Sequence, residues 1–234
     1  MKKYFRMFFP LYFVTAAVML TLVSLCSRAV TVMTENSAVD REHIIVIDAG
    51  HGGEDGGATS CSGVLESRLN LEFALQLNDL MHLLGFETKM IRTTDISIYT
   101  EGSTIAAKKV SDLKQRVKIV NETEGAFLVS IHQNLFPDSR YSGGQVFYNG
   151  QGEAKELATQ LQAALVSAVN PGSRRKAKPA EGVYLMQHIA KPGILVECGF
   201  LSNPEEEAKL RTGEYQKKIC CVIAATVAQS LSTT

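Results

Sequence analysis

IIVIDAGHGG, residues 44–53, is the stretch of this chain that decides its fold. Its first four residues form a continuous β-branched run, which is typical of a strand covered on both faces. The glycines that follow end the strand and allow the backbone to turn tightly. The stretch therefore predicts an internal strand of an α/β sheet, with His51 at the point where the chain leaves that strand.

Strand and helix patterns alternate along the rest of the chain. This alternation predicts a single α/β domain with a mostly parallel central sheet flanked by helices. Residues 95–110 have no clear periodicity and are expected to form a loop or a short helix. Strands are predicted at 86–92, 127–132, 144–148, 183–186 and 194–197, and helices at 65–84, 113–120, 153–169, 204–211 and 214–231.

The N-terminal region has the pattern of a membrane segment. Residues 7–26 carry no charge, and about 20 mostly apolar residues suffice to cross a bilayer as a helix. The basic residues before them favour a cytoplasmic N-terminus and export of the remainder. A cleaved signal peptide and an uncleaved anchor both fit, and the bulky Leu25 before Cys26 favours the anchor. We expect residues 1–35 to be a signal peptide or membrane anchor plus tether, and residues 36–234 to be one extracytoplasmic domain.

The charge pattern excludes one class of partner. From residue 36 onward there are 20 basic and 23 acidic residues, so the domain lacks the clustered positive charge of a nucleic-acid-binding surface. The short basic run at residues 174–178 is the exception. It fits a solvated loop, and it also fits a contact with acidic groups of a substrate or partner.

The five cysteines do not form a recognisable framework. Their number is odd and their spacing irregular, so no disulfide pattern is predicted. Cys220 and Cys221 lie in an apolar C-terminal helix, where buried packing is expected. Cys198 follows Glu197 in a strand and so points to the opposite face, which also indicates packing.

Three chemically active side chains lie at the ends of predicted strands: His51, His132 and Glu197. In open α/β sheets, functional groups gather at the carboxyl ends of the strands. Glu66 opens the helix after the first strand and is expected on the same side. Two histidines and a carboxylate are a ligand set for catalytic zinc, with one position left for water. A further carboxylate can accept a proton from that water, so the pattern indicates hydrolysis of an unactivated amide.

Each of these residues also has a purely structural interpretation. His51 fits a glycine-rich turn, and a buried His132 fits a hydrogen-bonded core histidine. Glu66 fits an acidic residue that stabilises the dipole at a helix N-terminus. Glu197 is harder to explain structurally, because a carboxylate at the end of an apolar strand is costly unless it is paired or lies near a metal.

Three motifs carry a family resemblance that spans about residues 43–232. IDAGHGGEDGGA (47–58), SIHQN (130–134) and VECGFLSN (196–203) resemble the signatures of the N-acetylmuramoyl-L-alanine amidases of the Amidase_3 family. The resemblance implies Zn²⁺ as cofactor, His51, Glu66 and His132 as its ligands, and Glu197 as the catalytic residue. It further implies cleavage of the amide between the lactyl group of N-acetylmuramic acid and L-alanine in peptidoglycan.

The compact layout is similar to that of the spore-cortex branch of this family. This similarity implies a role in sporulation and germination, through muramic-δ-lactam formation together with a peptidoglycan deacetylase. Some members of the branch need a lipoprotein activator that promotes zinc binding, so such a partner is possible here. Gln133 and Leu135 depart from the small residues that many relatives carry.

Asn134 and Arg116 are candidates for orienting the ligands or contacting substrate, because metal ligands need such partners. A surface charge on a helix is the alternative for Arg116. Two further functions stay open at this level: a zinc peptidase of similar fold, and a non-catalytic module that binds or regulates the cell wall.

Overall fold

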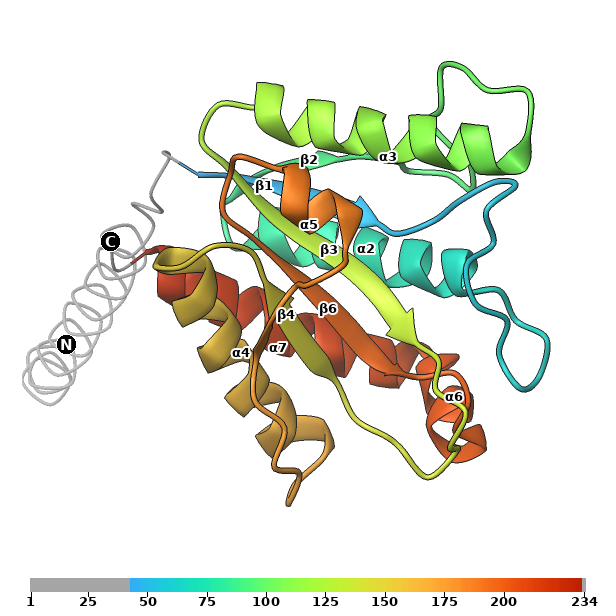
Figure 1. Ribbon diagram of the computed structural model, residues 1–234. Helices are drawn as coiled ribbons and strands as arrows, with labels where there is room; N and C mark the ends of the chain where they lie inside the picture. The colour runs from blue at the N-terminus through green and yellow to red at the C-terminus, as the bar shows by residue number, and fades with distance from the viewer. Residues whose placement is uncertain (1–42, 233–234) are drawn as a thin grey trace, which may run out of the picture. The chain divides into compact units, whose positions relative to one another are not determined.

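In the computed structural model, which describes residues 43–232, a six-stranded sheet carries helices on its faces (Figure 1). The strand order is β2-β1-β3-β6-β4-β5. Strands β4 and β6 form the one antiparallel pair of this sheet, and all its other neighbouring strands are parallel. The prediction of a mostly parallel sheet is confirmed, with the refinement that the sheet is mixed. The strands are β1 Ile44–Ala49, β2 Glu87–Met90, β3 Ala126–Asn134, β4 Gln145–Tyr148, β5 Lys178–Pro179 and β6 Gly193–Phe200.

Three of the helices that the structure describes begin with a side-chain cap. The side chains of Thr104, Asn203 and Thr212 accept hydrogen bonds from backbone N–H groups in the first turns of α3, α6 and α7. Helix α2 packs against α7, and α7 against α4, whereas α3 packs against α5. The helices are α2 Glu66–Leu83, α3 Ile105–Glu122, α4 Glu153–Val169, α5 Tyr184–His188, α6 Pro204–Leu210 and α7 Gly213–Leu231.

The central strands form the core because helices cover both of their faces. Residues 45–47 of β1 and 127–129 of β3 are completely buried. Val46, Leu128 and Leu195 pack beneath α3 and α5, together with Val120 and Leu185 of those helices. The continuous apolar runs read from the sequence are therefore those of strands buried on two sides.

The predicted strand at 183–186 is wrong, because these residues begin the short helix α5. Leu185 and Met186 are buried, whereas Gln187 and His188 are exposed. A four-residue apolar run does not distinguish a strand from one buried helical turn by its periodicity. The burial of this turn against the sheet decided its conformation.

Helix α3 begins earlier than the apolar spacing predicted. Residues 95–104 form a loop, and the helix starts at Ile105 instead of near Leu113. Its first two turns are exposed, including Ile105 and Val110, so they lack the apolar stripe from which a helix is recognised.

The membrane segment predicted at residues 7–26, and the boundary placed at residue 35, lie outside the described residues. Within residues 43–232, none of the helices has the length and apolar character needed to cross a bilayer.

The cysteine predictions are confirmed in part. Cys198 and Cys220 are fully buried, and burial raises the pKa of both thiols. Cys221 is exposed, because it lies one residue further around α7 and points away from the core, so its predicted burial is wrong.

Phe73 tests the packing of α2 against the sheet and α7. Its ring is fully buried, and its backbone carbonyl oxygen accepts a hydrogen bond from the Cys220 thiol. We expect Phe73→Ala to lower the free energy of unfolding by about 3–5 kcal/mol, because it leaves a cavity in the core. Leu75→Ala, on the exposed side of the same helix, is the control and should cost less than about 1 kcal/mol. Denaturant titrations measure both, and equal losses would contradict this packing.

Candidate metal centre

The turn that carries His51 has an unusual backbone conformation. Among residues 43–232, His51 is the one non-glycine residue with a positive φ, at 61°. Side chains disfavour this left-handed region, so the surrounding structure must hold the residue there. The nearest restraint is Arg116, whose Nη2 donates to the His51 carbonyl oxygen at 2.7 Å and whose Nη1 donates to that of Ala49 at 3.0 Å.

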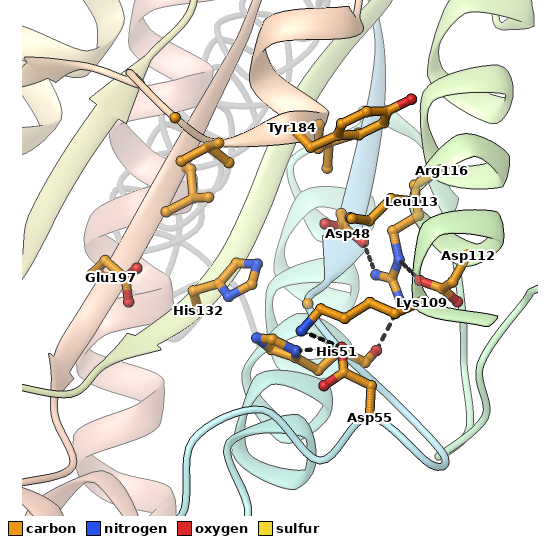
Figure 2. A pocket seen from close by; sticks show the side chains of 15 residues that line it. Asp48, His51, Asp55, Lys109, Asp112, Leu113, Arg116, His132, Tyr184 and Glu197 are labelled. Atoms are coloured by element: carbon orange, nitrogen blue, oxygen red, sulfur yellow. Dashed lines mark hydrogen bonds and ion pairs between the residues drawn. The ribbon is translucent and has the colours of Figure 1, made fainter. Parts of the chain in front are cut away.

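Arg116 is itself buried, with only 2% of its side chain exposed. Its guanidinium pairs with Asp48 at the end of β1 and donates through Nε to Asp112 at 2.6 Å (Figure 2). Burial would lower the pKa of Arg116, but Asp48 and Asp112 outweigh it and raise the pKa. Arg116 is therefore not a surface charge. Its hydrogen bonds to the carbonyl oxygens of Ala49 and His51 fix the backbone conformation at His51.

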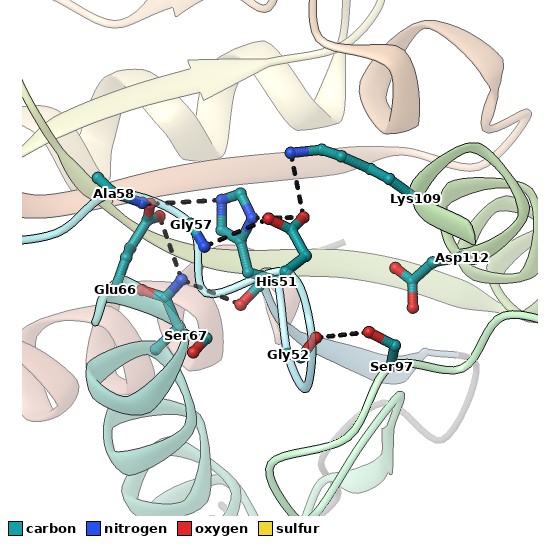
Figure 3. A network of polar contacts seen from close by, with 12 residues as sticks. His51, Gly52, Gly57, Ala58, Glu66, Ser67, Ser97, Lys109 and Asp112 are labelled. Atoms are coloured by element: carbon teal, nitrogen blue, oxygen red, sulfur yellow. Dashed lines mark hydrogen bonds and ion pairs between the residues drawn. The ribbon is translucent and has the colours of Figure 1, made fainter. Parts of the chain in front are cut away.

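Glu66 lies between the two histidines. Its Oε2 is 3.3 Å from His51 Nε2, and its Oε1 is 2.9 Å from His132 Nδ1. The backbone N–H of Ala58 donates to Oε2 at 2.9 Å (Figure 3). Asn70 Nδ2 donates to Oε1 at 3.2 Å. Burial alone would raise the pKa of Glu66, but the two histidines hold it well below its usual range. The carboxylate is thus ionised and faces both imidazoles.

Asp55 orients the ring of His51 from the other side. The Nδ1 atom of His51 is 2.9 Å from Asp55 Oδ2, and Lys109 Nζ is 3.1 Å from the same oxygen. A carboxylate on the second nitrogen fixes the orientation of a metal-binding imidazole and increases its basicity. Neither Asp55 nor Lys109 was among the predicted residues, although Asp55 lies four residues after His51 in the same motif.

Two glycines leave room for this group of side chains. A Cβ atom at Gly50 would lie 2.1 Å from His132 Nε2, and one at Gly57 would lie 2.6 Å from Glu66 Oε2. Larger residues at either position would therefore displace a histidine or the carboxylate. These glycines are required by the close approach of backbone to side chain.

The three predicted ligands are brought together in the structure. His51, Glu66 and His132 offer donor atoms that all lie within 4.8 Å of one another. Two imidazoles and one carboxylate suit zinc, and the set leaves a coordination position for water or substrate. The donor set and the glycine cradle therefore fit the ion that the sequence predicted.

Glu197 lies beside this group on the neighbouring strand. It pairs in register with His132, and its Oε2 is buried without a hydrogen-bond partner among the described residues. Burial raises the pKa of Glu197 to about 7, with His132 lowering it and Glu66 raising it. A carboxyl group that titrates near neutral pH is suited to accept a proton during hydrolysis.

A cavity of about 310 Å³ opens next to Glu197 and His132 (Figure 2). Helix α3 contributes Lys109 and Leu113 to its wall, and the start of α5 contributes Val183 and Tyr184. The wrongly predicted strand at 183–186 thus supplies part of the site. Tyr184 also stacks on His188, at 3.9 Å between ring centroids.

Within the part of the chain that the structure describes, Asn134 forms no hydrogen bond to the three candidate ligands. Its carbonyl oxygen accepts from the Leu201 N–H at 2.7 Å and so joins the ends of β3 and β6. Gln133 is buried, and its N–H donates to Glu66 Oε1 at 3.2 Å.

The comparisons with known proteins agree with this geometry. The model of the Amidase_3 family, described as N-acetylmuramoyl-L-alanine amidase, matches residues 45–229. The germination-specific N-acetylmuramoyl-L-alanine amidase of Bacillus subtilis (strain 168) is 40% identical over 182 residues, covering 77% of this chain and 76% of that protein. The solved CwlD amidase from Clostridioides difficile, in complex with the GerS lipoprotein, superposes with a TM-score of 0.78 at 35% identity, over 82% of this chain and 100% of that one. An N-acetylmuramoyl-L-alanine amidase from Clostridium difficile 630 gives 0.71 at 30% identity, over 83% and 100%.

Replacement of Asp55 should weaken metal binding without removing a ligand. We expect Asp55→Ala to reduce zinc affinity about 10- to 100-fold, because the His51 ring loses its orienting carboxylate. Asp138→Ala is the matched control, since Asp138 forms an ion pair with the exposed Arg140. Competition with a chelating dye measures both dissociation constants, and unchanged affinity in Asp55→Ala would refute this role.

Zinc affinity should fall as the pH is lowered. Burial opposes protonation of His132, but Glu66 and Glu197 outweigh it and raise its pKa above the usual 6.5. Protons therefore begin to compete with the metal for His132 at a pH above 6.5. Below the pKa of His132, zinc affinity should fall about tenfold for each pH unit, because one proton must leave before the metal binds. Dissociation constants measured between pH 8 and pH 5.5 test this expectation. The exposed His188, replaced by Ala, should leave the profile unchanged, and a flat profile in the parent chain would argue against histidine ligation.

Proposed function

Because the chain belongs to the Amidase_3 family of N-acetylmuramoyl-L-alanine amidases, we propose that it is a zinc-dependent enzyme that cleaves peptidoglycan between the lactyl group of N-acetylmuramic acid and L-alanine. The observation that supports this most directly is the convergence of His51, Glu66 and His132 beside Glu197, one of whose buried carboxyl oxygens has no hydrogen-bond partner within residues 43–232.

His51, Glu66 and His132 would hold the zinc ion. When bound, zinc polarises a carbonyl group and lowers the pKa of water. The protein residues supply the remaining requirements of the reaction. Arg116 and Asp55 fix His51, and the backbone N–H groups of Ala58 and Gln133 hold the Glu66 carboxylate in place.

Glu197 is the group that moves protons in this proposal. In its ionised form it accepts a proton from the water that attacks the amide carbon. It then delivers that proton to the departing nitrogen of L-alanine as the C–N bond breaks. The products are a lactyl carboxylic acid on the sugar and a free amino terminus on the stem peptide, so no covalent enzyme intermediate is required.

The cavity beside Glu197 is suited to the stem peptide in this proposal. The peptide is the branch that leaves the glycan at the cleaved amide, and a cavity of limited size next to Glu197 accommodates a branch better than a continuous polymer. Its wall combines Leu113 and Val183 with the polar side chains of Lys109 and Tyr184. Such a mixture of apolar surface and a few polar groups is typical of small-ligand sites.

The biological setting is inferred from the relatives. Similarity to a germination-specific amidase supports a role in the spore cortex, in which this enzyme removes stem peptides and a deacetylase completes muramic-δ-lactam. The CwlD relative was solved in complex with a lipoprotein, which supports a lipoprotein activator for this chain as well. The uncharged residues 7–26 would place the domain outside the cytoplasmic membrane, as an anchored or secreted protein.

Replacement of Glu197 separates metal binding from catalysis. We expect Glu197→Gln to retain zinc but to lose about 10²- to 10⁴-fold of the activity, because the general base is removed. The assay counts new L-alanine amino termini released from purified peptidoglycan by the full chain, with and without candidate lipoprotein partners. Glu122→Gln, which alters an exposed residue at the end of α3, is the control and should be fully active.

Each other outcome of this assay has a definite meaning. Full activity of Glu197→Gln would refute the mechanism. Cleavage between amino acids of the stem peptide, identified from product masses, would indicate a zinc peptidase. If the parent chain with zinc releases nothing in any combination, a non-catalytic wall-binding or regulatory module is indicated.

A further inference from the structure

Large apolar side chains lie exposed in the loop that follows β3, the strand that carries His132. Phe136 and Tyr141 are each 46% exposed, and their rings meet edge to face at 4.8 Å between centroids. Tyr141 also lies 6.1 Å from the ring of Phe200. We call Phe136, Tyr141 and Arg175, together with the buried ring of Phe200 (3% exposed), the rim platform. Exposed apolar groups that gather in this way mark interaction sites.

The rim platform is close to the catalytic residues. Phe136 follows His132 by four residues, and Phe200 follows Glu197 by three. At the rise of an extended strand, these separations correspond to about 10–13 Å. Asn134 and Phe200 pair across β3 and β6, so both segments leave the sheet at the same edge. A substrate bound at Glu197 and extending along this edge would therefore reach the platform.

The rim platform is braced by a buried carboxylate. Glu206 is 5% exposed, and it accepts hydrogen bonds from Gly143 N at 2.7 Å and from Phe200 N at 2.8 Å. It thereby ties the loop that carries Tyr141 to the end of β6. Phe136 N donates to Ser202 Oγ at 3.2 Å. Burying a carboxylate is costly, and a surface fixed in advance loses less entropy when it binds a ligand.

Arg175 completes the platform with hydrogen-bond donors. Its guanidinium lies 4.9 Å above the centre of the Phe200 ring and 5.9 Å from that of Tyr141. One nitrogen donates to the Ser142 carbonyl oxygen at 3.3 Å. Arg174 and Lys176 of the same basic run are exposed, whereas Arg175 is half-buried on the rings. A guanidinium that lies over an aromatic ring can still offer its N–H groups to a ligand.

We propose that the rim platform binds the glycan strand of peptidoglycan, next to the muramyl residue whose amide is cleaved. This inference rests on the proposed amidase function. A hexosamine ring has an apolar C–H face that fits the rings of Phe136 and Tyr141. Its hydroxyl and acetamido oxygens are acceptors for Arg175 and for the Tyr141 hydroxyl. A long polymer must lie on an open surface, which the platform provides, whereas the cavity on the α3 and α5 side suits the peptide branch.

Binding of peptide-free glycan strands tests the proposal directly. The full chain carries Glu197→Gln throughout, and Phe136→Ala or Tyr141→Ala is added to it. We expect either replacement to weaken binding about tenfold, since truncation of an aromatic anchor at a binding surface costs more than 1 kcal/mol. Tyr141→Phe keeps the ring and loses only the hydroxyl, so it should weaken binding less than Tyr141→Ala does. Leu83→Ala, at the far end of α2 and 81% exposed, should have no effect.

Turnover on two substrates gives an independent readout. With Glu197 restored, Tyr141→Ala should raise KM for polymeric peptidoglycan about tenfold relative to its KM for a single muramyl peptide without neighbouring sugars. Thermal denaturation midpoints, compared with that of Leu83→Ala, show whether each variant is folded.

Several outcomes would overturn the proposal. Unchanged glycan binding in both alanine variants would mean that another occupant, such as a protein partner, covers the platform. Equal losses on the two substrates would assign Tyr141 to the peptide or to general stability. Failure of the amidase proposal can be distinguished from failure of the glycan-binding proposal. In the first case the unsubstituted chain releases no alanine termini from either substrate. The glycan-binding measurement still tests the platform in that case.

Discussion

The guanidinium of Arg116 is buried between the carboxylates of Asp48 and Asp112 and donates to two carbonyl groups at the end of β1. A buried charge is tolerated only when its partners compensate for lost hydration, so this group and its two carboxylates depend on one another. The same contacts hold His51 in a conformation that its side chain disfavours. The direction in which His51 faces Glu66, and hence the metal centre, depends on this ion-pair network.

Glu66 and Glu197 show how neighbours divide two similar carboxyl groups between two roles. Burial alone would raise the pKa of both. At Glu66, hydrogen bonds from two histidines and from the backbone outweigh burial and keep the group ionised, as a metal ligand requires. Glu197 has an oxygen without a partner among the described residues, and its pKa rises to about 7, as a proton acceptor requires. The two environments push the pKa values of these carboxyl groups apart, which supports the different roles proposed for them.

Much of the fold was predictable because both faces of the central strands are covered. The apolar runs around Ile45 and Leu128 have one structural interpretation, and the helix predicted at residues 153–169 has the bounds that the structure gives it. The apolar pattern gave wrong predictions where a segment buries only one turn or exposes its first turns. Residues 183–186 form a buried helical turn instead of a strand, and the exposed first turns of α3 carry no apolar stripe.

The sequence by itself placed His51, His132 and Glu197 at one edge of the sheet, because the carboxyl ends of parallel strands meet there. Glu66 was identified through the family resemblance, since its position at a helix N-terminus has an ordinary explanation. The tertiary structure alone decided the roles of Arg116, Asp55 and the rim platform. Arg116 contacts residues more than sixty positions away, and the ring of Tyr141 lies beside that of Phe200 only because the chain folds back after β3. Such contacts are set by strand register and helix packing. The spacing of residues along one segment does not predict either of these.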